Sequence, residues 1–187
     1  MHVTDPRALR AMAHPLRLDL IEFLGTSGPA TAAECGRQLG STQASCSYHL
    51  RQLARYGFVE QAEERVDSRE RPWQLTDLEQ RWSGAERSPA TDELERVFVQ
   101  READRILAWH SESARQPEDW QDASFVGGAT VPLTAEELLR VRDELRAVLE
   151  PYVARLADPA NRPDGHRFVR IMLAGTPAGT DPERTSS

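Results

Sequence analysis

Residues 42–59 read TQASCSYHLRQLARYGFV, a stretch with signals for both ends of a helix. Thr42 is of a type preferred at helix N-caps, and Gly57 is of the type that ends helices. Between them lies a run without proline or glycine. The stretch therefore predicts a helix over residues 42–55.

The two faces of this helix differ in character. Successive residues of a helix are about 100° apart, which puts Cys46, Leu50 and Leu53 on one apolar face. The opposite face carries small, hydroxylated, aromatic and basic side chains, among them Tyr48 and Arg51, and no carboxylate. We expect the apolar face to pack on neighbouring helices and the other face to be free for a partner.

Three more helices are predicted upstream. Thr31 begins one that runs to Leu39, with Glu34 completing a capping box and Gly40 ending the helix. Before it, an apolar periodicity broken by Pro15 predicts helices over 5–13 and 14–25. Two helices joined by a tight turn that contains glycine predict a helix-turn-helix.

Downstream, residues 58–62 and 72–76 predict two short strands around the charged loop 63–71. This hairpin predicts a wing, with Arg69 and Arg71 placed to contact phosphates or the minor groove. Acidic residues interleaved with these arginines leave a self-paired charged surface as the alternative.

The exposed face of the 42–55 helix suits the major groove of duplex DNA. Small residues allow close approach, hydroxyl and amide groups bond phosphates or base edges, and arginine reaches guanine or phosphate. The alternative for this face is an ordinary solvated helix surface. For His49, a structural or phosphate-contacting role is expected rather than a catalytic one. The predicted DNA-binding residues are Thr42, Gln43, Ser45, Ser47, Tyr48, His49, Arg51, Arg55, Arg69 and Arg71.

Residues 43–53 and 57–59, with residues 13–17 and 20–21 upstream, resemble the ArsR family of winged-helix repressors. The resemblance covers residues 7–77, and the long region after the wing is similar to that of one branch of the family. It implies a homodimer that binds an inverted-repeat operator in double-stranded DNA as a repressor and is released by an effector. The metal sensors of the family carry a Cys-x-Cys pair on the helix before the recognition helix. This chain has only Cys35 there, so no metal site is expected.

Composition excludes several classes of protein. The net charge is −7, yet residues 35–59 carry three arginines and no acid, so the acidic excess lies outside the predicted DNA-binding segment. No secretion signal or membrane-spanning stretch is evident, and two cysteines give no disulfide framework, which favours a cytoplasmic protein. No phosphate loop, nucleophile motif, metal-ligand spacing or cofactor motif is present, so no enzymatic activity is expected.

Residues 91–114 predict a long helix capped by Thr91. Its apolar residues fall on two nearly opposite sides, which is typical of a helix buried between two layers. One side is expected to pack on its own winged domain and the other on a second copy, assisted by the 5–13 helix. The predicted interface residues are Leu9, Leu94, Val97, Phe98, Val99 and Ile106.

The rest of the chain predicts a loop over 115–122, a strand over 124–131, a helix begun by Thr134 with Glu137 in its capping box, and a strand over 168–173. These elements would leave an apolar groove near Trp109, Trp120, Phe125 and Phe168, either for a small organic effector or as a structural support of the dimer.

The expected fold is mainly α with a small β part. A winged helix-turn-helix domain (1–82) precedes a dimerisation and effector region (91–174) that contains the long helix and the strand-helix-strand extension, and a disordered tail (175–187) follows. A winged helix that binds only protein is the alternative function; it would show an apolar patch on the outer face of the 42–55 helix.

Overall fold

A computed structural model describes residues 1–62, 70–80, 82 and 88–178. The chain divides into two compact units, residues 1–110 and residues 111–187. The division therefore falls near the end of the long helix, whereas the sequence predicted a boundary between residues 82 and 91. Each unit is described by itself.

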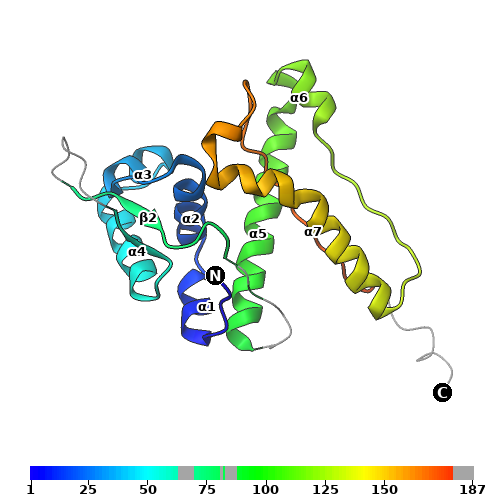
Figure 1. The fold of residues 1–187 in the computed structure, drawn as a ribbon, viewed down its shortest axis with the longest axis horizontal. Helices are drawn as coiled ribbons and strands as arrows, with labels where there is room; N and C mark the ends of the chain where they lie inside the picture. Colours follow the sequence, from blue (N-terminus) through cyan, green and yellow to red (C-terminus); the bar gives the residue numbers. More distant parts are fainter. Residues whose placement is uncertain (63–69, 81, 83–87, 179–187) are drawn as a thin grey trace. The chain divides into compact units, whose positions relative to one another are not determined.

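Four helices form the N-terminal part of the first unit, as the sequence predicted: α1 (Pro6–Met12), α2 (Pro15–Ser27), α3 (Ala32–Gln38) and α4 (Gln43–Arg55) (Figure 1). Local signals set their ends. Thr31 and Glu34 form the capping box of α3, and the Thr42 hydroxyl accepts from the Ser45 N–H at 3.1 Å. The break before α2 lies at His14, whose Nδ1 accepts from the Leu16 N–H at 3.2 Å.

The wing is a two-stranded antiparallel sheet of β1 (Val59–Gln61) and β2 (Trp73–Leu75). It confirms the predicted hairpin. Of the predicted loop 63–71, residues 63–69, which include Arg69, lie outside the described residues. A contact that the sequence did not indicate ties the wing to the segment before α3. The Ala30 N–H donates to the Trp73 carbonyl at 3.0 Å, and the Trp73 N–H donates to the Ala30 carbonyl at 2.7 Å.

The long helix α5 spans Pro89–Glu112 and begins earlier than the sequence predicted. The Ser88 hydroxyl accepts from the Thr91 N–H at 3.2 Å, and proline is favoured in the first turn because it needs no hydrogen-bond acceptor there. Thr91 is buried inside the helix, so its predicted role as the cap is wrong.

An ion-pair cluster fixes α5 to α2. The Arg101 guanidinium donates from Nε to Asp19 and from Nη2 to Glu22, both at 2.7 Å, and Arg105 donates to both oxygens of Glu22 at 2.7 and 3.0 Å. Arg101 also donates to the buried carboxylate of Glu102 at 2.9 Å. Burial raises the pKa of Glu22, but the hydrogen bonds from Arg105 and Arg101 outweigh that effect and hold its pKa below the usual value. We name this set of five residues the α2–α5 charge cluster.

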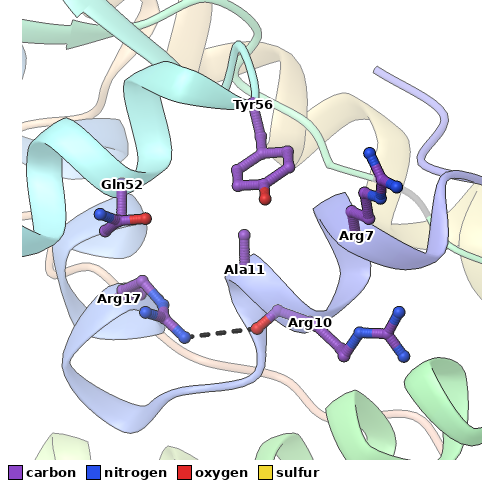
Figure 2. Close-up of a pocket in the computed structure, with 6 residues that line it drawn as sticks. All are labelled: Arg7, Arg10, Ala11, Arg17, Gln52 and Tyr56. Carbon is purple, nitrogen blue, oxygen red and sulfur yellow. Dashed lines mark hydrogen bonds between the residues drawn. The ribbon is translucent and has the colours of Figure 1, made fainter.

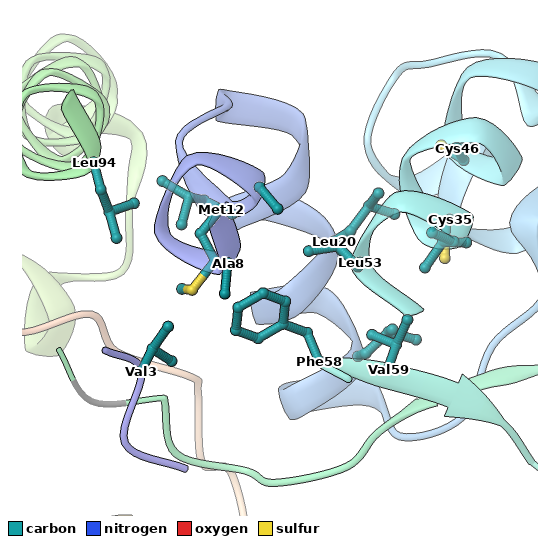
Figure 3. Close-up of a cluster of buried hydrophobic side chains, with 14 of the residues drawn as sticks. Val3, Ala8, Met12, Leu20, Cys35, Cys46, Leu53, Phe58, Val59 and Leu94 are labelled. Atoms are coloured by element: carbon teal, nitrogen blue, oxygen red, sulfur yellow. The ribbon is translucent and has the colours of Figure 1, made fainter. Parts of the chain in front are cut away.

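The apolar core of the first unit joins all five helices and the wing. Phe58 lies at its centre, between α1 residues such as Met12 and α4 residues such as Leu53 (Figure 3). Leu94 of α5 is fully buried in the same core. The wing and the helix-turn-helix therefore share one core with the long helix, which holds α4 in a fixed orientation.

The second unit contains η1 (Ser113–Arg115), α6 (Glu118–Ala123), α7 (Ala135–Ala157) and η2 (Pro159–Asn161). The predicted loop over 115–122 is wrong, because α6 follows Pro117 with two acids in its first turn, where the helix dipole favours them. The start of α7 is as predicted, with the Thr134 and Glu137 capping box in place.

The two strands predicted in this unit are not found. Residues 124–131 and 168–173 have no strand assignment, and the sheet of the described chain contains only β1 and β2. An extended segment becomes a strand only when a neighbour pairs with its backbone, and two strands alone are marginal. Neither segment has such a neighbour, so this part of the predicted fold is wrong.

No residue between 111 and 178 is buried. The apolar side chains of α7 lie outside any core, with Val148 and Tyr152 more than half exposed. Arg167 lies over the Trp120 ring at 4.9 Å and Arg162 over the Phe168 ring at 5.3 Å. Guanidinium groups therefore lie over two of the four aromatic rings of the predicted groove. Binding of a small organic effector there remains a prediction.

Gly36 sets the approach of α3 to the start of α4, which gives a test of the helix-turn-helix geometry. A Cβ at Gly36 would lie 2.9 Å from the Ser41 carbonyl oxygen and 3.2 Å from the Gln43 nitrogen. We expect Gly36→Ala to lower the free energy of unfolding by about 1–3 kcal/mol, because backbone must move to admit the methyl group. Urea unfolding followed by circular dichroism measures the change. Gly127→Ala is the control, since its Cβ meets nothing within 4 Å; equal stability of the two variants would contradict the close contact.

The two cysteines give a second test. Cys35 and Cys46 are fully buried in the core, and burial, with a smaller effect of Cys46, raises the pKa of Cys35 to about 12. Because the thiolate is the reactive form, neither thiol should react with an aromatic disulfide reagent in the folded protein at pH 8, and both should react in guanidinium. Ala44→Cys, at an exposed position on α4, supplies a reactive thiol for comparison. Rapid labelling of the native parent chain would contradict the buried placement.

Candidate nucleic-acid interface

The helix α4 has one buried and one exposed face, as the sequence predicted. Cys46, Leu50 and Leu53 are fully buried. On the other side Tyr48 is 53% exposed, and Arg51 and Arg55 are exposed as well. The exposed face carries no carboxylate of its own, so its charge is positive.

The start of α4 combines a cap with polar side chains. Thr42 and Gln43 are exposed, and Ser45 and Ser47 are half-buried at the edges of the face. The Gln43 amide donates to Glu70 at the base of the wing. The wing and the beginning of α4 therefore meet, and Gln43 must leave Glu70 before it can contact another acceptor.

His49 is the one predicted α4 contact that points away from the exposed face. Its ring lies 4.4 Å from the His14 ring, centroid to centroid, and 5.1 Å from the Tyr48 ring in an edge-on arrangement. Its Nδ1 is buried and has no hydrogen-bond partner among the described residues. Burial, together with His14 and Arg17, lowers the pKa of His49, which favours the neutral ring. The structural role is thus the one that this geometry favours, with the ring supporting Tyr48 from beside.

The part of the wing that the structure describes is joined to the end of α4. Arg71 is exposed, while Arg69 lies outside the described residues. The Thr76 hydroxyl donates to the Gly57 carbonyl at 2.6 Å and so ties the exit of β2 to the end of α4. The predicted wing contacts remain predictions.

Three arginines outside the predicted site also lie near α4. Arg7 and Arg10 of α1 and Arg17 of α2 line a hollow with Gln52 of α4 and Tyr56 at the C-cap of that helix. The spacing of Arg7 and Arg10 by three residues, which puts them on one side of a helix, is a signal that the sequence analysis did not use.

The predicted dimer residues fall into two groups. Leu9 and Leu94 lie in the core of the chain itself, and Val97 and Phe98 pack against that core, with the Phe98 ring 5.5 Å from the Trp82 ring. These four are engaged within one copy of the chain. Val99 and Ile106, which are 50% and 38% exposed, remain available on the other side of α5.

Within the described ranges, no group of three or more histidine, cysteine, aspartate or glutamate side chains is placed to hold a metal ion. Among the helices of the described chain, none is both long and apolar enough to span a bilayer.

Comparison with known proteins adds one family and two distant structures. Residues 12–62 match the model of a helix-turn-helix domain family. The curated proteins contain no significant match. Of the solved structures, the transcriptional regulator Tm0710 from Thermotoga maritima is 15% identical with a TM-score of 0.32, over 75% of this chain and 79% of that one. A variant of ZitR from Lactococcus lactis is 14% identical with a TM-score of 0.31, over 76% of this chain and 73% of that one.

These TM-scores are too low for the two structures to indicate the fold or the function of this chain. The family match covers α2, α3, α4 and β1, together with the end of α1. Residues 12–62 therefore form a helix-turn-helix domain, and with β2 the fold is a winged helix.

Proposed function

We propose that this protein is a sequence-specific transcriptional regulator that binds duplex DNA as a homodimer and acts as a repressor of the ArsR kind. One observation carries the proposal, namely the exposed face of α4. Tyr48, Arg51 and Arg55 project from a helix whose opposite side is fully buried.

The chemistry of this face supports base reading. An arginine that projects from the middle of a recognition helix can donate two hydrogen bonds to guanine, and a small residue such as Ala44 lets the helix approach the groove. Hydroxyl groups at Thr42, Ser45 and Ser47 can bond phosphates, which fixes the register of the protein on the duplex. The buried core beneath α4 holds the backbone that carries these groups, so that the helix itself need not form on binding.

Net charge does not oppose this function. The net charge of the chain is −7, but the only charged side chains that α4 contributes to its exposed face are arginines. Phosphate attraction depends on the local charge of the contact surface more than on the total. A module that binds only protein is the second candidate, and it is less well supported because Tyr48 is the one large aromatic side chain on this face.

The first test separates base contacts from phosphate contacts. Arg51→Ala should weaken operator binding by about 1–3 kcal/mol and relax the preference at one position of each half-site, because a base contact is lost. Arg71→Ala should weaken binding to all sequences alike and reduce the salt slope by about one unit. Both effects are measured by titrating the protein against DNA from upstream of its own gene and against a scrambled duplex, at several salt concentrations.

Arg146→Ala is the matched control for these variants, since Arg146 is an exposed arginine of α7, outside α4, α5 and the wing. It should bind like the parent protein. If Tyr48→Ala and Arg51→Ala both left operator affinity unchanged, α4 would not be the reading helix and the proposal would fail.

The exposed side of α5 supports the dimer. Val99, Ala103 and Ile106 form a stripe on one side of the helix, with Leu107, 67% exposed, beside it. The other side is occupied by the core of the same chain. A two-fold axis along this stripe would bring identical stripes together and present two copies of α4 to successive half-sites of an inverted repeat.

The second test concerns this assembly. Light scattering at micromolar concentration should give about twice the chain mass of 21.0 kDa. Ile106→Glu should give the monomer mass, because it buries two like charges at the axis, and should weaken operator binding. Leu78→Glu, at an exposed leucine outside α5, should stay dimeric. A monomeric parent protein would contradict the proposed dimer.

A further inference from the structure

A pocket of about 260 Å³ opens between α1, α2 and α4 on the flank of the recognition helix. Figure 2 shows the Tyr56 hydroxyl pointing toward Ala11, with Gln52 and Arg17 on one side and Arg7 on the other. The lining residues are Arg7, Arg10, Ala11, Arg17, Gln52 and Tyr56. Three of the six are arginines and none is acidic, so the pocket has a strongly positive lining.

Arg17 is the arginine of this pocket whose guanidinium has both a hydrogen bond and a buried nitrogen. Its Nη2 donates to the Arg10 carbonyl at 3.3 Å (Figure 2), while its Nε is buried without a hydrogen-bond partner among the described residues. Burial lowers its pKa, and Tyr48 and Glu93 offset this only in part from a distance. A desolvated guanidinium without a contacting carboxylate is costly, and an anion in the pocket would relieve that cost.

The other lining groups complete a donor set. Arg7 is exposed, and in the described chain its guanidinium forms no ion pair. Gln52 in the last turn of α4 and Tyr56 at its C-cap are both half-buried, and they add an amide and a hydroxyl. Ala11 has no long side chain, so the centre of the pocket stays open. Arginine forks with amide and hydroxyl donors are the groups that recognise the oxygens of phosphate.

We propose that this α1–α2–α4 pocket is a phosphate-binding site. Its volume lies below the range of about 300–1,000 Å³ that is common for larger ligands, which fits a single phosphate group. The group can come from two sources, a phosphodiester of the duplex backbone or a free phosphate in solution. The first source rests on the proposed DNA-binding function, because Gln52 lies on α4 and Tyr56 follows its last residue, next in sequence to Arg51 and Arg55.

Binding of inorganic phosphate tests the site itself. At constant ionic strength, replacing chloride by phosphate should raise the melting temperature of the parent protein, and calorimetry should give its affinity. Arg7→Gln and Arg17→Gln should each weaken phosphate binding by about tenfold, because each loses a charged hydrogen bond. Tyr56→Phe should have a smaller effect. Arg146→Gln, at an exposed position on α7, should bind phosphate like the parent.

Duplex binding distinguishes the two sources. If a backbone phosphate fills the pocket, Arg7→Gln should weaken binding to operator and scrambled DNA equally and reduce the salt slope by about 0.9, and inorganic phosphate should compete with DNA. If free phosphate is the ligand, the salt slope of Arg7→Gln should equal that of the parent. Since Arg7 is exposed, its variant stays informative even if Arg17→Gln is poorly folded.

The proposal is overturned if Arg7→Gln and Arg17→Gln both bind phosphate and duplex DNA as the parent protein does. It is also overturned if the parent protein itself binds neither inorganic phosphate nor duplex DNA. A parent protein that binds phosphate in the pocket but no duplex would contradict the proposed function and leave the pocket standing. The two failures can therefore be told apart.

Discussion

The placement of α4 depends on the close contact between α3 and the turn at residues 41–43. Gly36 leaves room for the backbone there, and the Ser41 N–H donates to the Gly36 carbonyl at 2.9 Å. With α3 and α4 so near, Cys35 and Cys46 can both be fully buried. Every exposed group of α4, from Tyr48 to Arg55, takes its direction from this contact.

Local signals in the sequence predicted the helices well, because caps and breaks act over a few residues. Thr31 with Glu34, Thr42, and Thr134 with Glu137 each begin a helix where expected. The burial of Leu50 and Leu53 also followed from helix periodicity alone. These features need no knowledge of distant parts of the chain.

Features that depend on distant partners were predicted less well. Apolar runs at 124–131 and 168–173 have strand composition but lack a backbone to pair with. The pair Ala30 and Trp73 joins segments more than 40 residues apart, and the pocket gathers Arg7, Arg17 and Gln52 from three helices. Nor could the sequence tell which apolar side of α5 enters the core of its own chain.

The α2–α5 charge cluster has a consequence for how the protein behaves in different buffers. Its ion pairs are partly withdrawn from solvent, with the Arg101 side chain 10% exposed, so added salt screens them less than it screens the arginines of α4. The attachment of the long helix and the phosphate attraction of the proposed DNA-binding face therefore respond unequally to ionic strength. In the proposed complex, moderate salt should detach the DNA well before it loosens the scaffold, and the intact protein can then be recovered simply by raising the salt concentration.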